Sequence, residues 1–307
     1  MIVLTGATGV VGSALLRRLL AQGEQVRVLV RDPRRLGPDR VRVQITLGDL
    51  SNPVALRQLV RGAREVVHLA ATIRDQPGGS IEELNGVATA RLLRHAEAAG
   101  AERFLFFGAM GATPSSRTRF FRSKALAAQA VMDSPMNATV MAPSIVYDPG
   151  DRWVTLLRRM SLLPVMPVIG SGRASYQPIW AEDVAACALK VMREGAPGGA
   201  RRLELAGPDV LTYEEIVKLA MSAWGRDRRV VHLPLWMVER SLRLLERLFG
   251  PTVFATWEEA ELMEVPMVTA AGTRDARSLG VEPQHMAEVL GRDRGYLGRP
   301  LAAASAA

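Results

Sequence analysis

Short apolar runs alternate with longer amphipathic stretches over the first half of the chain. The runs are rich in β-branched residues and four to six residues long, which is typical of buried strands. Between them, apolar residues recur every three or four positions, as they do along a helix with one buried face. The pattern predicts strands at residues 2–5, 25–30, 41–46, 65–70, 103–107 and 138–142.

Two of the amphipathic stretches, residues 10–23 and 80–100, have clear helical patterns, and each ends at a glycine. Glycine is a common helix stop because it adopts the left-handed conformation without steric cost. Strands that alternate with helices in this way form a parallel sheet covered on both faces. The sequence therefore predicts an α/β fold with a Rossmann-like, doubly wound parallel sheet.

The regular alternation is lost after about Tyr147, where prolines mark longer connections at positions 149, 164, 167 and 178. We expect a first domain over residues 1–147, then interleaved last strands and a small C-terminal α/β lobe over 148–300, and a frayed tail over 301–307. Helices are expected at 212–224 and 235–249. The apolar stripe of 235–249 fits the core of the lobe, and a helix that binds a partner or a membrane surface is the alternative.

The segment "LTGATGVVG" places Gly6, Gly9 and Gly12 between the first strand and the first helix. The first glycine allows a tight turn, the second lets a phosphate approach the backbone, and the third lets helix and strand pack closely. The helix N-terminus then offers free N–H groups to a pyrophosphate. The motif therefore predicts a nicotinamide-dinucleotide site that also includes Thr8, Val10 and Val11.

The end of the second strand, "VLVRDPRR", bears on which cofactor binds. Arginine here accommodates the 2′-phosphate of NADP, whereas an acidic residue binds the ribose 2′-hydroxyl of NAD. Arg31, Arg34 and Arg35 favour NADP(H), since a guanidinium fork matches a phosphate dianion. Asp32 keeps NAD open, because a shift of one residue would bring its carboxylate to the ribose.

Motifs along the chain resemble those of the extended and atypical short-chain dehydrogenase/reductases, and among them the relatives of the nucleotide-binding accessory subunit of respiratory complex I. The resemblance covers about residues 1–290 and rests on "TGATGVVG", "GDL", "VVHLAA", a lysine at 124, "APSIVYDPGD" and "QPIWAEDVA". It implies that Asp49 and Leu50 meet the adenine, and that Lys124 holds the nicotinamide ribose. It also implies that the dinucleotide is lined by Ala70 and Ala71 and covered at the nicotinamide by Pro143, Ser144 and Ile145.

Two positions depart from the pattern of the family members that transfer hydride. Phe120 stands where those members have the tyrosine that handles the proton, four residues before Lys124, and Gly108 stands where they have serine or threonine. A phenyl ring cannot act as a general acid, and general acid–base catalysis is worth roughly 10²–10⁴-fold. The cofactor side of the site is therefore expected to be intact, while the proton-handling side is not.

Two functional hypotheses follow. The first is an NADP(H)-binding protein with a structural, assembly or redox-sensing role. The second is an NAD(P)H-dependent reductase of an apolar carbonyl, quinone or isoprenoid-like substrate, with Lys124, Tyr147 or water as the proton source. A nucleotide-sugar epimerase or dehydratase is disfavoured, because that chemistry relies on the same absent tyrosine.

Composition bears on the expected partners and cellular location of the protein. The 307 residues carry a net charge of +8, but the arginines are scattered, so no nucleic-acid partner is expected. The single cysteine, Cys187, fits a reducing compartment, and neither a leader nor a membrane-spanning run is visible, so we expect a cytoplasmic protein. No set of His, Asp or Glu residues has the spacing of metal ligands in the sequence. The expected partners are the dinucleotide and an apolar small molecule or a protein, with peripheral membrane contact left open.

Overall fold

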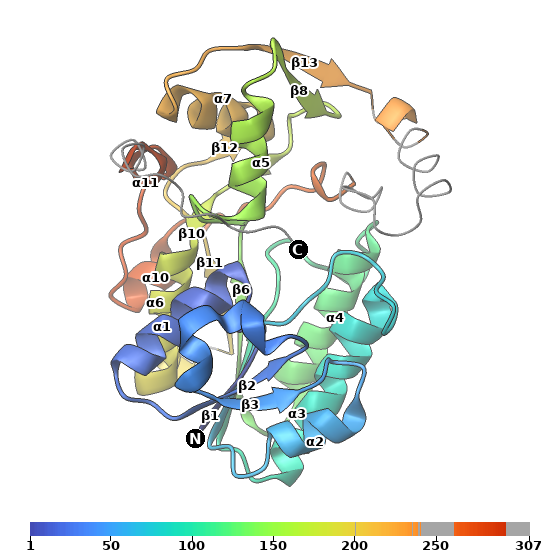
Figure 1. Cartoon of the computed structure of the whole chain (residues 1–307), viewed down its shortest axis with the longest axis vertical. Helices are drawn as coiled ribbons and strands as arrows, with labels where there is room; N and C mark the ends of the chain where they lie inside the picture. Colours follow the sequence, from blue (N-terminus) through green and yellow to red (C-terminus); the bar gives the residue numbers. More distant parts are fainter. Residues whose placement is uncertain (200, 235, 239, 241–260, 293–307) are drawn as a thin grey trace.

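The centre of the molecule is a seven-stranded sheet whose neighbouring strands pair in parallel (Figure 1). The computed structural model describes residues 1–199, 201–234, 236–238, 240 and 261–292. The strands lie in the order β11 (Arg202–Leu205), β6 (Asn137–Pro143), β5 (Arg103–Phe107), β4 (Glu65–His68), β1 (Ile2–Thr5), β2 (Val26–Val30) and β3 (Gln44–Leu47). This order confirms the predicted doubly wound, Rossmann-like fold.

Helices cover both faces of the sheet and bury its apolar side chains in two separate cores (Figure 1). Leu15, Val28 and Ala185 belong to one core, and Leu56, Leu92 and Val131 belong to the other. The first face carries α1 (Val10–Ala21), α6 (Ala181–Glu194) and α10 (Arg274–Ser278); the second carries α2 (Pro53–Leu59), α3 (Ala88–Ala98) and α4 (Arg119–Asp133). Because helices bury both faces of the sheet, its inner strands form nearly continuous apolar runs in the sequence.

A smaller lobe stands above the carboxyl ends of the strands and has its own core around Tyr147, Tyr176 and Ile216 (Figure 1). Its helices are α5 (Arg152–Met160), α7 (Tyr213–Ala223) and α11 (Met286–Arg292); its short strand pairs are β7 (Val146–Tyr147) with β10 (Ile179–Trp180), β9 (Ser175–Tyr176) with β12 (Leu211–Thr212), and β8 (Val165–Ile169) with β13 (Arg229–Leu233). Between these elements the chain returns to the main sheet, with the short 3₁₀ turn η3 (Pro197–Gly199) between α6 and β11.

The boundary after residue 147 stays a prediction. Most of the helix expected at 235–249 lies outside the described residues, and so does the whole tail 301–307. Among the described helices, none combines the length and the apolar character that crossing a bilayer requires.

Two predicted elements differ from the structure. The strand expected at 41–46 begins only at Gln44, because the 3₁₀ segment η1 (Pro33–Val41) occupies the residues before it. Pro38 and the positive φ of 59° at Gly37 interrupt extended backbone there. The helix expected at 80–100 begins at Ile81 and contains a π turn, η2 (Glu83–Val87), in its first part. Within this turn, the side chain of Asn85 bonds both backbone groups of Thr72 at 2.9 and 2.7 Å.

Candidate functional site

The turn between β1 and α1 has the geometry of an anion site. Gly6 has a φ of 76°, and a Cβ there would lie 2.7 Å from the backbone nitrogen of Ala70. At Gly12 a Cβ would lie 2.0 Å from the carbonyl oxygen of Gly6, so only glycine fits. Gly9 is the N-cap of α1, and no side chain caps the helix. The first N–H groups of α1 are therefore left for a phosphate.

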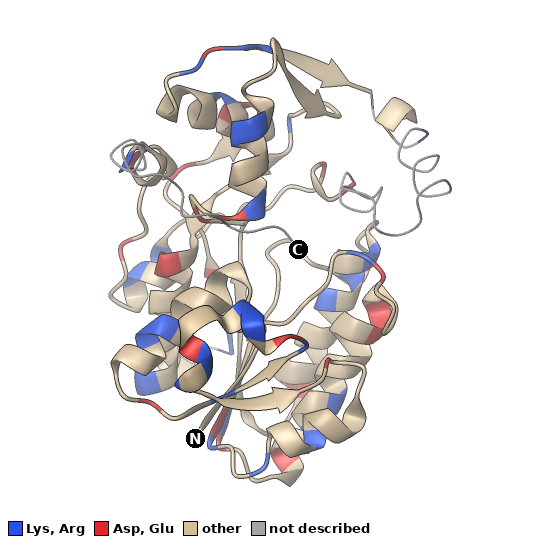
Figure 2. Ribbon diagram, in the orientation of Figure 1, with Lys and Arg blue, Asp and Glu red and all other residues tan. Residues whose placement is uncertain are grey.

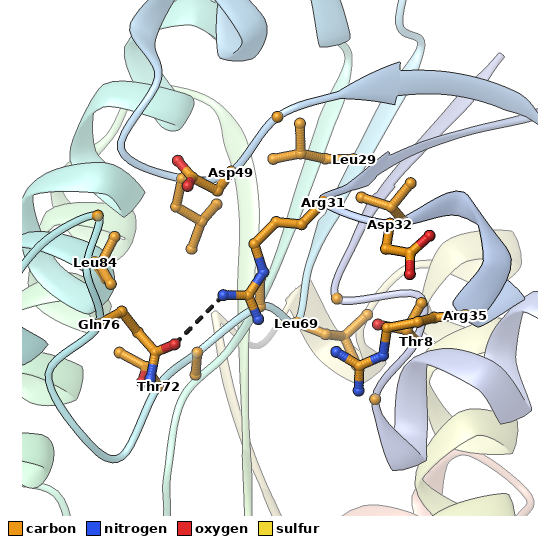
Figure 3. A pocket seen from close by; sticks show the side chains of 18 residues that line it. Thr8, Leu29, Arg31, Asp32, Arg35, Asp49, Leu69, Thr72, Gln76 and Leu84 are labelled. Atoms are coloured by element: carbon orange, nitrogen blue, oxygen red, sulfur yellow. Dashed lines mark hydrogen bonds between the residues drawn. The ribbon is translucent and has the colours of Figure 1, made fainter. Parts of the chain in front are cut away.

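A cavity of about 350 Å³ opens beside this turn, at the carboxyl ends of β1, β2, β3 and β4 (Figure 3). The residues predicted for the cofactor that line it are Gly6, Thr8, Gly9, Arg31, Arg35, Asp49, Leu50, Ala70 and Ala71. Val10, Val11 and Gly12 lie next to the cavity in the first turn of α1. The other predicted contacts lie outside this lining: Arg34, Lys124, Pro143, Ser144 and Ile145.

Of the charged residues after β2, Arg31, Asp32 and Arg35 line the cavity, and Asp32 also caps the turn η1. Arg31 extends across the cavity, where its Nη1 donates to Gln76 Oε1 at 3.3 Å (Figure 3). Asp32 caps η1 by accepting from the backbone N–H of Arg34 at 3.0 Å, and it also pairs with the Arg34 guanidinium at 3.1 Å. These two hydrogen bonds hold the pKa of Asp32 below its usual range. Arg34 is thus turned toward Asp32, while Arg35 lines the cavity.

Asp49 lies at the opposite wall, immediately after β3. Its Oδ1 accepts from the backbone N–H of Ser51 at 2.9 Å and from the Ser51 hydroxyl at 2.5 Å. A Cβ at Gly78 would lie 3.2 Å from Asp49 Oδ2, so the loop after β4 passes close to this carboxylate. The resemblance assigns this position to the adenine, and its place at the wall of the cavity is compatible with that role.

Part of the lining was not predicted from the sequence. These residues are Leu29, Val30, Gly48, Leu69, Thr72, Gln76, Gly78 and Leu84. Several of these residues are sequence neighbours of predicted ones, so their positions at the cavity can be inferred once the strand ends are known. Gln76 and Gly78 belong to the segment "DQPGGS", whose proline and glycines signal a loop but not the direction in which it folds.

Lys124 is buried at the base of the nicotinamide side of the site, on α4. Its Nζ donates to the carbonyl oxygen of Phe107 and lies 4.4 Å from the centre of the Phe106 ring. Burial lowers the pKa of Lys124 to about 7. One turn earlier on the same helix stands Phe120, which is half-buried with its ring 5.5 Å from that of Phe121.

Gly108 directly follows β5 and leaves little room for a larger residue. Its N–H donates to Met141 O at 2.8 Å, and a Cβ would lie 3.1 Å from Cγ1 of Val140. A side chain there would require Val140 to move. Neither Gly108 nor Phe120 carries a hydroxyl, so these positions supply no proton beside Lys124.

His68 lies behind the site and is saturated by two hydroxyls. Its Nδ1 is 2.6 Å from Thr5 Oγ1, and its Nε2 is 2.9 Å from Thr89 Oγ1. Burial, with a smaller contribution from the charge of Lys124, lowers the pKa of His68 to about 3. The ring is therefore neutral and serves as a hydrogen-bonded part of the core.

The segment after β6 joins the sheet to the smaller lobe. Ser144 Oγ donates to Met267 O at 2.7 Å and accepts from Gln177 N at 3.1 Å, which ties the chain around Met267 to the end of β6. Tyr147 is fully buried in the core of the lobe, and burial raises its pKa. Its hydroxyl has no hydrogen-bond partner among the described residues. Within the same residues, no cluster of three His, Cys, Asp or Glu side chains forms a metal site.

The glycine turn, the uncapped helix and the cavity at the strand ends together define a nicotinamide-dinucleotide-binding protein of the Rossmann class. The profile of the family described as NAD(P)H-binding matches residues 6–194, and the chain belongs to this family. The resemblance to atypical short-chain dehydrogenase/reductases is thereby confirmed.

Two relatives illustrate the range of the family. The chain is 29% identical over 244 residues to the mitochondrial NADH dehydrogenase (ubiquinone) 1 alpha subcomplex subunit 9 of Arabidopsis thaliana, covering 75% of this chain and 59% of that protein. It is 30% identical over 236 residues to the ceramide reductase of Caulobacter vibrioides, covering 76% of this chain and 74% of the relative. The chain thus spans less than two thirds of the first relative.

Among solved structures, the UDP-glucose 4-epimerase of Thermotoga maritima superposes with a TM-score of 0.72 over 96% of this chain and 98% of that one. The identity is 17%, so this likeness shows the shared fold alone.

Proposed function

We propose that the protein binds NADP(H) and uses the bound cofactor in a structural, assembly or redox-sensing role, without hydride transfer that depends on a tyrosine. The observation that carries this proposal is the contrast along α4. Lys124 is retained and buried next to the end of β5, while Phe120, one turn away, has no proton to give. The similarity to a subunit of a larger enzyme complex supports a role in assembly.

The preference for NADP(H) is supported by the arginines around the cavity. Arg31 and Arg35 line it, and a 2′-phosphate between them would gain charge-assisted hydrogen bonds. Asp32 already accepts from Arg34, which favours its role as a helix cap over a role as a ribose ligand.

A reductase of an apolar carbonyl, quinone or isoprenoid-like substrate is the second candidate. The lowered pKa of Lys124 favours it, because an amine that titrates near pH 7 is suited to proton transfer at neutral pH. The similarity to a ceramide reductase points the same way. In this candidate Lys124 or a water molecule would supply the proton. Tyr147 is less well supported, because its hydroxyl is buried in the core of the smaller lobe.

Binding and turnover distinguish the two candidates. NADPH affinity is measured by titration calorimetry, and NADPH oxidation is followed with quinones and carbonyls. We compare the parent, Phe120→Tyr, and Phe120→Tyr with Gly108→Ser in a Val140→Ala background that makes room for the serine. For the proposed function we expect NADPH binding in all variants, no turnover in the parent, and a modest gain in the last variant.

A gain above about 10²-fold is not expected, because a misplacement of about 1 Å can cost that much. Turnover in the parent that Phe120→Tyr does not change would reject the scaffold or sensor role in favour of the reductase. Failure of the parent to bind either NADPH or NADH would reject both candidates.

A further inference from the structure

The end of the smaller lobe farthest from the central sheet exposes apolar side chains. Leu162 and Leu163 follow α5, and Val165 begins β8; their exposed fractions are 64%, 48% and 41%. Next to them lie Arg228 and Arg229, where the chain enters β13. We call these five residues the apical patch.

Hydrogen bonds and strand pairing hold the apical patch together. Arg228 Nε donates to Leu163 O at 3.2 Å, and Val165 is the register partner of Arg229 in the parallel pair β8–β13. Arg226 fastens the same loop to the end of α5 by donating to Ser161 Oγ at 2.6 Å. The patch is therefore a continuous, preformed surface.

The alternation of β8 explains why its apolar residues face outward. Met166 and Val168 point into the core of the lobe and are fully buried, so Val165 lies on the opposite side of the strand. The exposed apolar surface continues past β13 with Leu233, Trp236 and Met237. The outer face of a half-buried strand pair is usually polar, whereas here it carries exposed apolar side chains.

The charges around the patch are basic. Figure 2 shows blue ribbon on α5 and along the loop that enters β13. Among the described residues, Arg228 donates to the backbone carbonyls of Leu163 and Asp227. In the part of the chain that the structure describes, neither Arg229 nor the exposed Arg159 forms an ion pair, and Asp227 is the acidic residue of the loop.

We infer that the apical patch docks the protein on the surface of a bilayer that contains anionic lipids. Leucine side chains enter the boundary between headgroups and acyl chains, and arginines stay at the level of the lipid phosphates. A second copy of the chain fits less well, because a two-fold contact through this patch would bring Arg228 and Arg229 against the same residues of the other copy. Docking by this end keeps the bilayer away from the dinucleotide cavity, because the cavity lies at the carboxyl ends of the central strands and the apical patch lies at the far end of the smaller lobe (Figure 1).

Vesicle flotation with the full chain tests the inference. Vesicles of phosphatidylcholine alone are compared with vesicles that also contain phosphatidylglycerol, at low and high salt. We expect binding to the anionic vesicles only, weakened by salt. Leu162→Ser with Leu163→Ser, and separately Arg228→Glu with Arg229→Glu, should each lower the partition coefficient by about tenfold or more.

Matched controls separate docking from general charge and hydrophobicity. Leu47→Ser removes a leucine on β3 with the same 64% exposure as Leu162, and Arg57→Glu with Arg94→Glu makes the same charge change on α2 and α3. Both controls should bind vesicles like the parent, and all variants should keep the NADPH affinity of the parent. Equal losses in controls and patch variants would overturn the inference. So would absence of vesicle binding, or a dimer in light scattering that the leucine variant disrupts.

Discussion

The adenosine side and the nicotinamide side of the site are preserved to different degrees. On the adenosine side, glycines fit where no other residue can, arginines line the cavity, and α1 offers an uncapped N-terminus. On the nicotinamide side, Lys124 is retained without either hydroxyl partner, since the positions hold Phe120 and Gly108. Binding a dinucleotide and moving its hydride place separate demands on the chain, and we propose that this chain meets the first more fully than the second.

The largest effect is expected from the glycine turn. Gly12→Ala places a methyl group 2.0 Å from the carbonyl oxygen of Gly6, so α1 must shift away from the turn. We expect NADPH binding to fall by at least about 100-fold, because the phosphate approach and the packing of helix and strand fail together. Calorimetry gives the affinity, and circular dichroism reports whether the variant is folded.

Gly291→Ala is the control for that change, since a Cβ in α11 would meet nothing within 4 Å. A folded Gly12→Ala variant with the affinity of the parent would show that the turn does not bind the pyrophosphate.

A smaller effect is expected at Lys124. Lys124→Met keeps the length of the side chain and removes the amine that we propose bonds the nicotinamide ribose, so NADPH affinity should fall about 10- to 100-fold. Unchanged affinity would show that Lys124 does not reach the cofactor. The nicotinamide side would then lack a cofactor contact at Lys124 as well as the two hydroxyl groups.

The same variant should change how stability depends on pH. The pKa of Lys124 is about 7 in the folded protein, whereas the ordinary pKa of a lysine is 10.5, so between these values the unfolded chain binds more protons. The free energy of unfolding of the parent should therefore rise with pH over this window relative to Lys124→Met. Urea titrations at pH 6, 8 and 10 measure it, and parallel curves would contradict a buried amine.

The smallest effect is expected at Arg31, because its side chain is exposed. Arg31→Ala should lower the preference for NADPH over NADH by about tenfold, since one charged hydrogen bond to the 2′-phosphate is lost. Arg34→Ala is the matched control, because Arg34 lies outside the cavity lining and pairs with Asp32. Tighter binding of NADH by the parent would instead indicate that Asp32 binds the ribose.

Much of the fold follows from local pattern. Strands buried on both faces, such as β1, β4 and β5, are apolar except at their ends and were predicted within two residues. Edge strand β3 has three exposed residues out of four, so its apolar pattern is weak, and the turn η1 in front of it was missed. The π turn at Asn85 was missed for another reason: its side chain bonds Thr72, a contact that only the fold creates.

In the candidate site, too, residues set by local sequence could be predicted and residues placed by tertiary contacts could not. Gly6, Gly9 and Gly12 could be predicted because the turn is local and its geometry requires glycine. Gln76 could not, because its place at the cavity depends on how the loop after β4 folds back toward Arg31. The burial of Lys124 next to Phe107 likewise depends on packing between α4 and β5, which no local pattern encodes.

The hydrogen bond from Ser144 to Met267 joins residues 123 positions apart. During synthesis, the strands of the sheet and the glycine turn emerge from the ribosome well before Met267, and α10 completes one face of the sheet only afterwards. If the adenosine side binds NADPH as we propose, we expect it to hold the cofactor on a nascent chain before the nicotinamide side is finished. NADPH present during translation would then act as a folding template, and ribosome-bound chains ending at residue 234 should already bind it.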